Sequence, residues 1–101
     1  VGEKLWTLTE GHQVLCVTHL PQLASFGDKH FHVTKQLTSK RTISQLTILD
    51  DAQTRSAELA EMLGAVGESG LQSARDILIE ADHRKSELVK EVETERQNPA
   101  F

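Results

Sequence analysis

A short apolar run that leads into a single histidine constrains this chain more than any other feature. Residues 14–17 (VLCV) are apolar, and Thr18-His19 follows directly. An apolar run without alternation is typical of a strand buried on both faces of a parallel sheet. Open α/β sheets place ligand-binding side chains at the carboxyl ends of such strands. We therefore expect a buried strand over residues 13–18 and a functional position at His19.

The segments around this run indicate helices, as an α/β fold requires. Residues 1–9 carry apolar positions at helical spacing, and Gly11 suits the residue that follows a helix. Pro21 suits the first turn of a short helix over residues 21–26. Because the chain opens within a helical pattern that has no cap before it, we expect it to be an excised piece.

Two further segments indicate a β-hairpin. Residues 29–37 and 41–49 alternate between apolar and polar side chains, and the polar turn 38–40 separates them. We expect the hairpin at the edge of a sheet whose core strands are parallel.

The pattern of the second half of the chain predicts two helices. Either Asp50 or Asp51 caps the first, over residues 52–63. Its apolar side comprises Ala52, Leu59, Met62 and Leu63. The second helix is expected over residues 69–97, with Asn98-Pro99 ending it.

This long helix carries one apolar stripe, which Lys85 interrupts. The stripe comprises Leu71, Ala74, Leu78, Ala81, Leu88 and Val92. Charged residues dominate after Ala81, so we separate residues 82–101 as a charged helical tail.

Composition narrows the class of protein. The 101 residues suffice for one small domain or part of a larger one. The single cysteine, Cys16, cannot form an internal disulfide, which suits a reducing cytosol, and its place in the expected strand predicts a buried, inert thiol. Residues 1–50 carry a balance of +1 and residues 51–101 a balance of −5, with no basic stripe. The chain alone is therefore expected to bind nucleic acid poorly.

His19 has two interpretations. A histidine at a strand end is often structural, held by a hydrogen bond. Alternatively, its imidazole could donate a hydrogen bond to an anionic oxygen, as a phosphate-sensing or catalytic group does.

His30 and His32 lie two apart on an expected strand and so share a face. Zinc would need a third and usually a fourth ligand, for which His12, Cys16 or His19 would have to come close. No paired ligand spacing of the zinc-finger kind is present, so we assign no metal ligand. A solvent-facing edge strand is the simpler interpretation.

Three segments of the sequence carry a family pattern when they are taken in order. The first is residues 17–22 (VTHLPQ), with Ala24, Asp28, His30, Val33 and Lys35 after it. The second is Arg55-x-x-Glu58-x-Ala60-x-Met62-Leu63-Gly64, and the third is Ser73-Ala74-Arg75 with Leu78. Together they resemble the RecN-type bacterial DNA repair ATPases of the SMC-like branch of the ABC family, and the resemblance covers about four fifths of the chain, up to Ala81.

The resemblance implies a fold and a site. The chain would be the C-terminal part of an ABC-type P-loop ATPase head, with parallel core strands, an edge hairpin and flanking helices. His19 would be the switch (H-loop) histidine, which contacts the γ-phosphate of ATP, and so would be both catalytic and cofactor-binding. The full-length protein would use ATP and Mg²⁺. The Walker A, signature and Walker B motifs are absent from this sequence, so the chain alone is expected to be inactive and to hold no cofactor.

The implied setting is DNA double-strand-break repair, recombination and the SOS response, in the bacterial cytoplasm at the nucleoid. The implied partners are DNA, reached through the full-length protein, and the other half of the ATPase head. We also expect a homodimer, formed through uncovered strand edges and the apolar stripe of the long helix. The alternatives are a non-enzymatic interaction module that uses the long helix and a small metal-binding domain built on His30 and His32.

Overall fold

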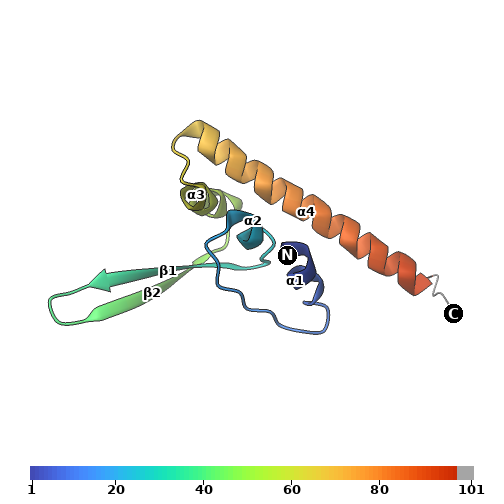
Figure 1. The fold of residues 1–101 in the computed structure, drawn as a ribbon, viewed down its shortest axis with the longest axis horizontal. Helices are drawn as coiled ribbons and strands as arrows, with labels where there is room; N and C mark the ends of the chain where they lie inside the picture. Colours follow the sequence, from blue (N-terminus) through green and yellow to red (C-terminus); the bar gives the residue numbers. More distant parts are fainter. Residues whose placement is uncertain (98–101) are drawn as a thin grey trace.

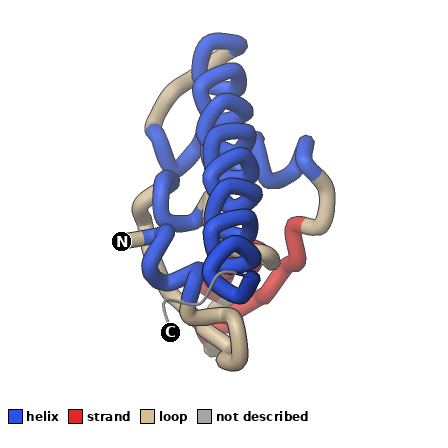
Figure 2. The backbone as a smooth tube through the Cα atoms, turned by 90° about the vertical axis from the view of Figure 1, so that its right-hand side faces the viewer, coloured by secondary structure: helices blue, strands red, loops and turns tan. Residues whose placement is uncertain are grey.

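The computed structural model describes residues 1–97 as a group of helices with one projecting hairpin (Figure 1). In chain order the elements are α1 (Gly2–Thr7), α2 (Pro21–Ala24), β1 (His30–Leu37), β2 (Thr42–Leu49), α3 (Ala52–Leu63) and α4 (Glu68–Gln97). The shorter helices gather along α4 (Figure 2), and the two strands project away from it (Figure 1). The expected end of the long helix at Asn98-Pro99 lies outside the described residues.

The hairpin confirms the alternating pattern of its sequence. β1 and β2 pair antiparallel, with His30 opposite Leu49 and Leu37 opposite Thr42. The backbone N–H of Thr38 donates to the carbonyl of Arg41 at 2.8 Å and closes the turn. Since opposite residues in an antiparallel pair share a face, the histidines of β1 lie on the same side as Leu49.

The buried parallel strand expected over residues 13–18 is not observed. The segment belongs to no strand, and the only sheet within residues 1–97 is the two-stranded hairpin. The side chains of Leu15 and Val17 are 87% and 96% exposed, and Cys16 is exposed rather than buried. A strand needs a hydrogen-bonded neighbour, and the described residues supply none to this segment. The expectation of a parallel core in this chain, and of an inert buried thiol, was therefore wrong.

The ends of α3 follow the expected chemistry. A carboxylate oxygen of Asp51 accepts a 2.7 Å hydrogen bond from the backbone N–H of Thr54, so Asp51 rather than Asp50 is the N-cap. Gly64 ends the helix at a φ of 70°, the left-handed conformation that favours glycine.

The core of the chain lies between α3 and α4. Leu59 and Ala74 are fully buried and Ala60 nearly so, and five half-buried residues pack against them: Ala24, Met62, Leu63, Leu71 and Leu78. Small alanine side chains let the two helices approach closely around one leucine. Ala52, expected on the apolar side of α3, is exposed instead, and Ser56 takes a buried place on that side.

The apolar stripe of α4 is covered within the chain. Ala74, Ala81 and Leu88 are buried, and Leu71, Leu78 and Val92 are half-buried. The stripe is therefore not the open surface that we expected to drive a dimer or dock a partner. Apart from the exposed segment 13–18, several exposed apolar side chains share the hairpin face opposite the histidines, which comprises Phe31, Val33, Leu46 and Ile48.

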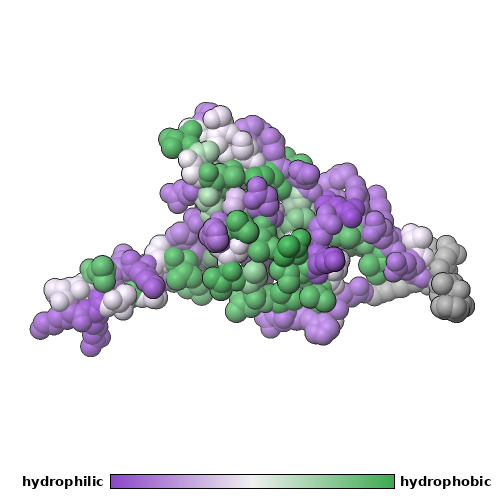
Figure 3. Space-filling view, viewed as in Figure 1, coloured by the Kyte–Doolittle hydropathy of each residue, from purple (hydrophilic) through white to green (hydrophobic). Residues whose placement is uncertain are grey.

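Hydrophobic residues gather over the middle of the face drawn in Figure 3, and hydrophilic residues cover α4 and the hairpin tip. Within residues 1–97 no helix combines the length and the hydrophobicity needed to cross a membrane.

Candidate functional site

His19 lies at a bend between the unpaired segment 13–18 and α2. The Thr18 hydroxyl accepts a 3.0 Å hydrogen bond from the backbone N–H of Leu20, which sets the bend. Pro21 is buried at the first position of α2, where its missing N–H costs nothing. The His19 side chain is exposed and forms no hydrogen bond or ion pair with the described residues. The strand end expected beneath it is absent, but the exposed imidazole is available to a ligand.

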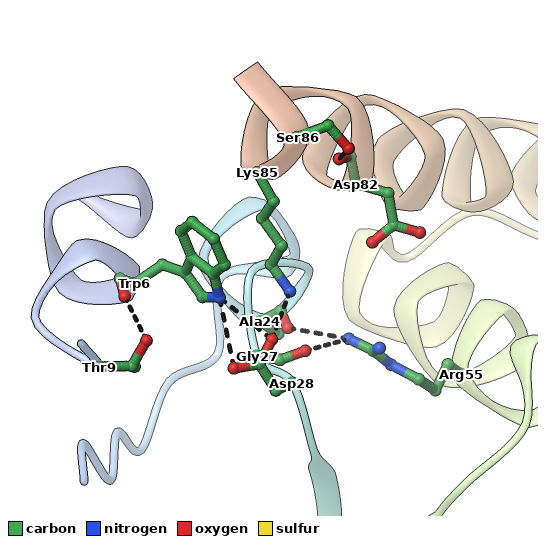
Figure 4. A network of polar contacts seen from close by, with 9 residues as sticks. All are labelled: Trp6, Thr9, Ala24, Gly27, Asp28, Arg55, Asp82, Lys85 and Ser86. Carbon is green, nitrogen blue, oxygen red and sulfur yellow. Dashed lines mark hydrogen bonds and ion pairs between the residues drawn. The ribbon is translucent and has the colours of Figure 1, made fainter. Parts of the chain in front are cut away.

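Arg55 of α3 contacts the C-terminal end of α2. Its Nη2 donates to the carbonyl of Gly27 at 3.0 Å and to that of Ala24 at 3.5 Å (Figure 4). The last carbonyls of a helix have no partner within the helix, so a cation there satisfies them and complements the helix dipole. Arg55 thus joins α3 to the turn that ends the histidine-bearing segment.

One residue after that turn, Asp28 connects three distant parts of the chain. Its carboxylate accepts from Nε1 of Trp6 at 3.0 and 3.3 Å, and Nζ of Lys85 lies 3.0 Å from Oδ1. The same ammonium group lies 5.5 Å from the centre of the Trp6 ring, a cation–π contact (Figure 4). We call Trp6, Asp28 and Lys85 the Asp28 cluster. It joins α1 and α4 to the loop between α2 and β1.

The charges of this cluster favour the ionised carboxylate. Burial alone would raise the pKa of Asp28, but hydrogen bonds from Lys85 and Trp6 outweigh it and hold the pKa below its ordinary value of 3.8. A carboxyl group with a lowered folded-state pKa stabilises the fold above its unfolded-state pKa, and this contribution is lost as the pH falls through the folded-state value.

Trp6 is the only tryptophan and the chain has no tyrosine, so its fluorescence reports on the Asp28 cluster directly. We expect the emission of Trp6 to stay constant from pH 7 to pH 5 and to move to longer wavelength below pH 3.8, where Asp28 gains a proton and releases the indole. Far-UV circular dichroism on the same samples separates this step from unfolding. Asp28→Asn should remove the step, and a step of equal size in that variant would contradict the assignment.

The two histidines of β1 face α3 rather than solvent. Nδ1 of His32 lies 2.8 Å from Oε1 of Glu58, and both side chains are half-buried. Burial lowers the pKa of His30, and the charge of Arg55 lowers it further, which favours a neutral imidazole. Neither Nδ1 of His30 nor Nε of Arg55, both buried, has a hydrogen-bond partner. The interpretation of an edge strand facing solvent was therefore wrong.

A metal site is not assembled by these groups. Within residues 1–97 no three His, Cys, Asp or Glu side chains lie close enough together to hold a metal ion. His12, Cys16 and His19 are all exposed on the segment that precedes α2. His30 and His32 instead connect the hairpin to α3.

Sequence reasoning missed the contacts made by Lys85, Arg55 and Asp28. Lys85 carried a signal, because a cation that interrupts an apolar stripe needs a nearby acidic partner. Arg55 stood out only as part of a family motif, and its acceptors are backbone carbonyls, which no sequence pattern reveals.

Several curated proteins similar to this chain bear the same name. The chain is 52% identical over 66 residues to the DNA repair protein RecN of Xylella fastidiosa, a match to 65% of the chain. It is 47% identical over 83 residues to the RecN of Vibrio cholerae, and 35% identical over 88 residues to that of Bacillus subtilis, which covers 80% and 85% of the chain. The chain spans only 12 to 15% of the length of these relatives. No protein-family model matches it.

Proposed function

This chain is a RecN-type sequence, related to a segment of bacterial DNA repair proteins, and from that premise we propose that it forms the C-terminal part of an ATPase head in which His19 contacts the γ-phosphate of ATP. In this proposal ATP binding and hydrolysis by the full-length protein drive the repair of DNA breaks in the bacterial cytoplasm. The chain contributes one side chain to the ATP site rather than the whole site.

The exposure of His19 on a structured bend is the observation that carries this proposal. An imidazole N–H donates a hydrogen bond to an anionic oxygen, and no group among the described residues competes for it. Pro21 and the Thr18 hydroxyl restrict the backbone on either side, so the imidazole needs little reordering to meet a phosphate. A donor placed where negative charge develops lowers the barrier to phosphoryl transfer.

The rest of the ATP site must come from outside this chain. The sequence holds no glycine-rich loop with a lysine to bind phosphates, and the described residues contain no cluster of three or more His, Cys, Asp or Glu side chains that could hold a metal ion. Mg²⁺ would supply charge neutralisation at the β- and γ-phosphates when bound there. His19 would add a hydrogen bond to an anionic phosphate oxygen.

The proposed partners are also divided between this chain and the other parts of the full-length protein. The net charge of −4 and the absence of a basic stripe indicate that DNA contacts other parts of the full-length protein. A homodimer of this chain would use the exposed apolar face of the hairpin, since the α4 stripe is already covered.

Chemical modification of histidine tests the proposed site. We expect diethyl pyrocarbonate to modify His19 of the nucleotide-free, full-length protein. A non-hydrolysable ATP analogue with Mg²⁺ should protect His19 from modification, because the γ-phosphate then contacts the imidazole and shields it from the reagent. Peptide mass spectrometry follows each histidine separately.

His12 is the matched control, because it is also exposed and lies seven positions earlier. It should react equally with and without the analogue. If His19 reacts as fast as His12 at a saturating concentration of the analogue, His19 does not contact the nucleotide and the proposal is wrong.

A further inference from the structure

We infer that Arg55 is a positioning residue that sets the location of His19 through α2, and this inference rests on the proposed role of His19 at the ATP site. Arg55 itself lies in α3, more than thirty positions later in the chain, and binds no part of the nucleotide in this scheme. It acts through the backbone of the segment that carries the histidine.

The contact is made at the opposite end of α2 from His19. Nη2 of Arg55 donates to the carbonyls of Gly27 and Ala24 at 3.0 and 3.5 Å. The Ala24 carbonyl also accepts a 3.0 Å hydrogen bond from the backbone N–H of Gly27. Arg55 therefore binds a turn that is closed by its own backbone hydrogen bond, rather than a single unconnected carbonyl. Because α2 has only four residues, which is about 6 Å of helix, a shift at this turn moves the whole helix and the bend before it.

On the other side of His19, the described residues supply only the local bend at Thr18. Residues 13–18 pair with no strand in the described part of the chain, and Val17 is 96% exposed. The position of His19 is therefore set from α2 onward. Ala24 packs against the buried core between α3 and α4, so apolar contacts also hold α2 in place. Arg55 adds a polar contact from α3 to the backbone at the C-terminal end of α2.

The Asp28 cluster holds the adjacent residue and does not replace Arg55. Lys85 and Trp6 bind the Asp28 side chain, which can rotate, whereas Arg55 binds main-chain carbonyls, which move only with the backbone. A displacement of about 1 Å at a reacting group can cost roughly a hundredfold in rate. A small shift of α2 would therefore lower the rate of ATP hydrolysis even if the stability of the fold did not change measurably.

A double-mutant cycle in the full-length protein tests this inference. Steady-state ATP hydrolysis is measured for Arg55→Met, His19→Ala and the double variant. We expect Arg55→Met to lower kcat at least about tenfold, with KM little changed. The reason is that a displaced His19 would stabilise the transition state less well. In the His19→Ala background the same substitution should cost almost nothing, because the residue that it positions is already gone.

Two further variants separate positioning from general damage. Arg55→Lys keeps a cation that can reach one carbonyl, so it should restore part of the lost kcat. Arg75→Met removes an exposed arginine from the neighbouring helix and should leave kcat unchanged. Thermal melting checks each variant, and if Arg55→Met does not fold, the cycle is run with Arg55→Lys.

The outcomes are distinguishable. If Arg55→Met costs the same factor in both backgrounds, or costs nothing in the wild-type background, Arg55 does not position His19 and the inference is overturned. If His19→Ala retains full turnover, the proposed function fails first, and this inference fails with it.

Discussion

Replacing His19 with alanine in the full-length protein is expected to lower ATP turnover by roughly a hundred- to a thousandfold. The side chain is exposed and forms no hydrogen bond or ion pair within the described chain, so its removal deletes the proposed hydrogen bond to the developing charge and little of the core. The melting temperature should therefore stay at the wild-type value. Steady-state hydrolysis and differential scanning calorimetry measure the two quantities.

The control for this prediction is His12→Ala, which removes an equally exposed imidazole from the same segment and should leave turnover unchanged. A His19→Ala protein that hydrolyses ATP at the wild-type rate would return His19 to the structural interpretation. A lower melting temperature with normal turnover would do so as well.

The largest expected effect on stability comes from Leu59. It is the only large side chain that is fully buried among the described residues, and it lies where α3 packs on α4. Leu59→Ala in the 101-residue chain should lower the free energy of unfolding by about 2 to 5 kcal/mol, through lost burial and the cavity left behind. Much of the stability of a small domain would then be lost.

Urea denaturation followed by circular dichroism measures this change. Leu46→Ala is the matched control, because Leu46 is 62% exposed on the hairpin and its truncation should shift the free energy of unfolding by no more than about 0.5 kcal/mol. Equal midpoints for the two variants would show that α3 and α4 do not form the core.

Local patterns in the sequence predicted most of the elements. Alternation over residues 29–37 and 41–49 indicated the hairpin, because side chains of a strand alternate between its faces whatever the rest of the fold does. Asp51 and Gly64 marked the ends of α3, since capping depends on a few neighbouring backbone groups. The stripe of α4 followed from helical spacing alone, and its face is the one that is buried.

The same kind of pattern failed at residues 14–17. An apolar run describes a strand only when neighbouring strands accept its hydrogen bonds, and those partners are not among the described residues. The prediction for Cys16 failed for the same reason, because its burial depended on that sheet. The prediction of His19 at a strand end failed with the strand, so its proposed role rests on the family resemblance and on its exposure at the bend before α2.

What the sequence alone determined is therefore local: the hairpin, the start of α3 at one of two adjacent aspartates, and the helical stripe of α4. Each is set by residues within a few positions of one another. The tertiary structure alone decided the pairings across the chain. Arg55 reaches the carbonyl of Gly27 and Lys85 reaches Asp28 because α3 and α4 pack against the end of α2. Such contacts depend on distances between elements, and those distances are set by how the apolar faces pack, which no local pattern encodes.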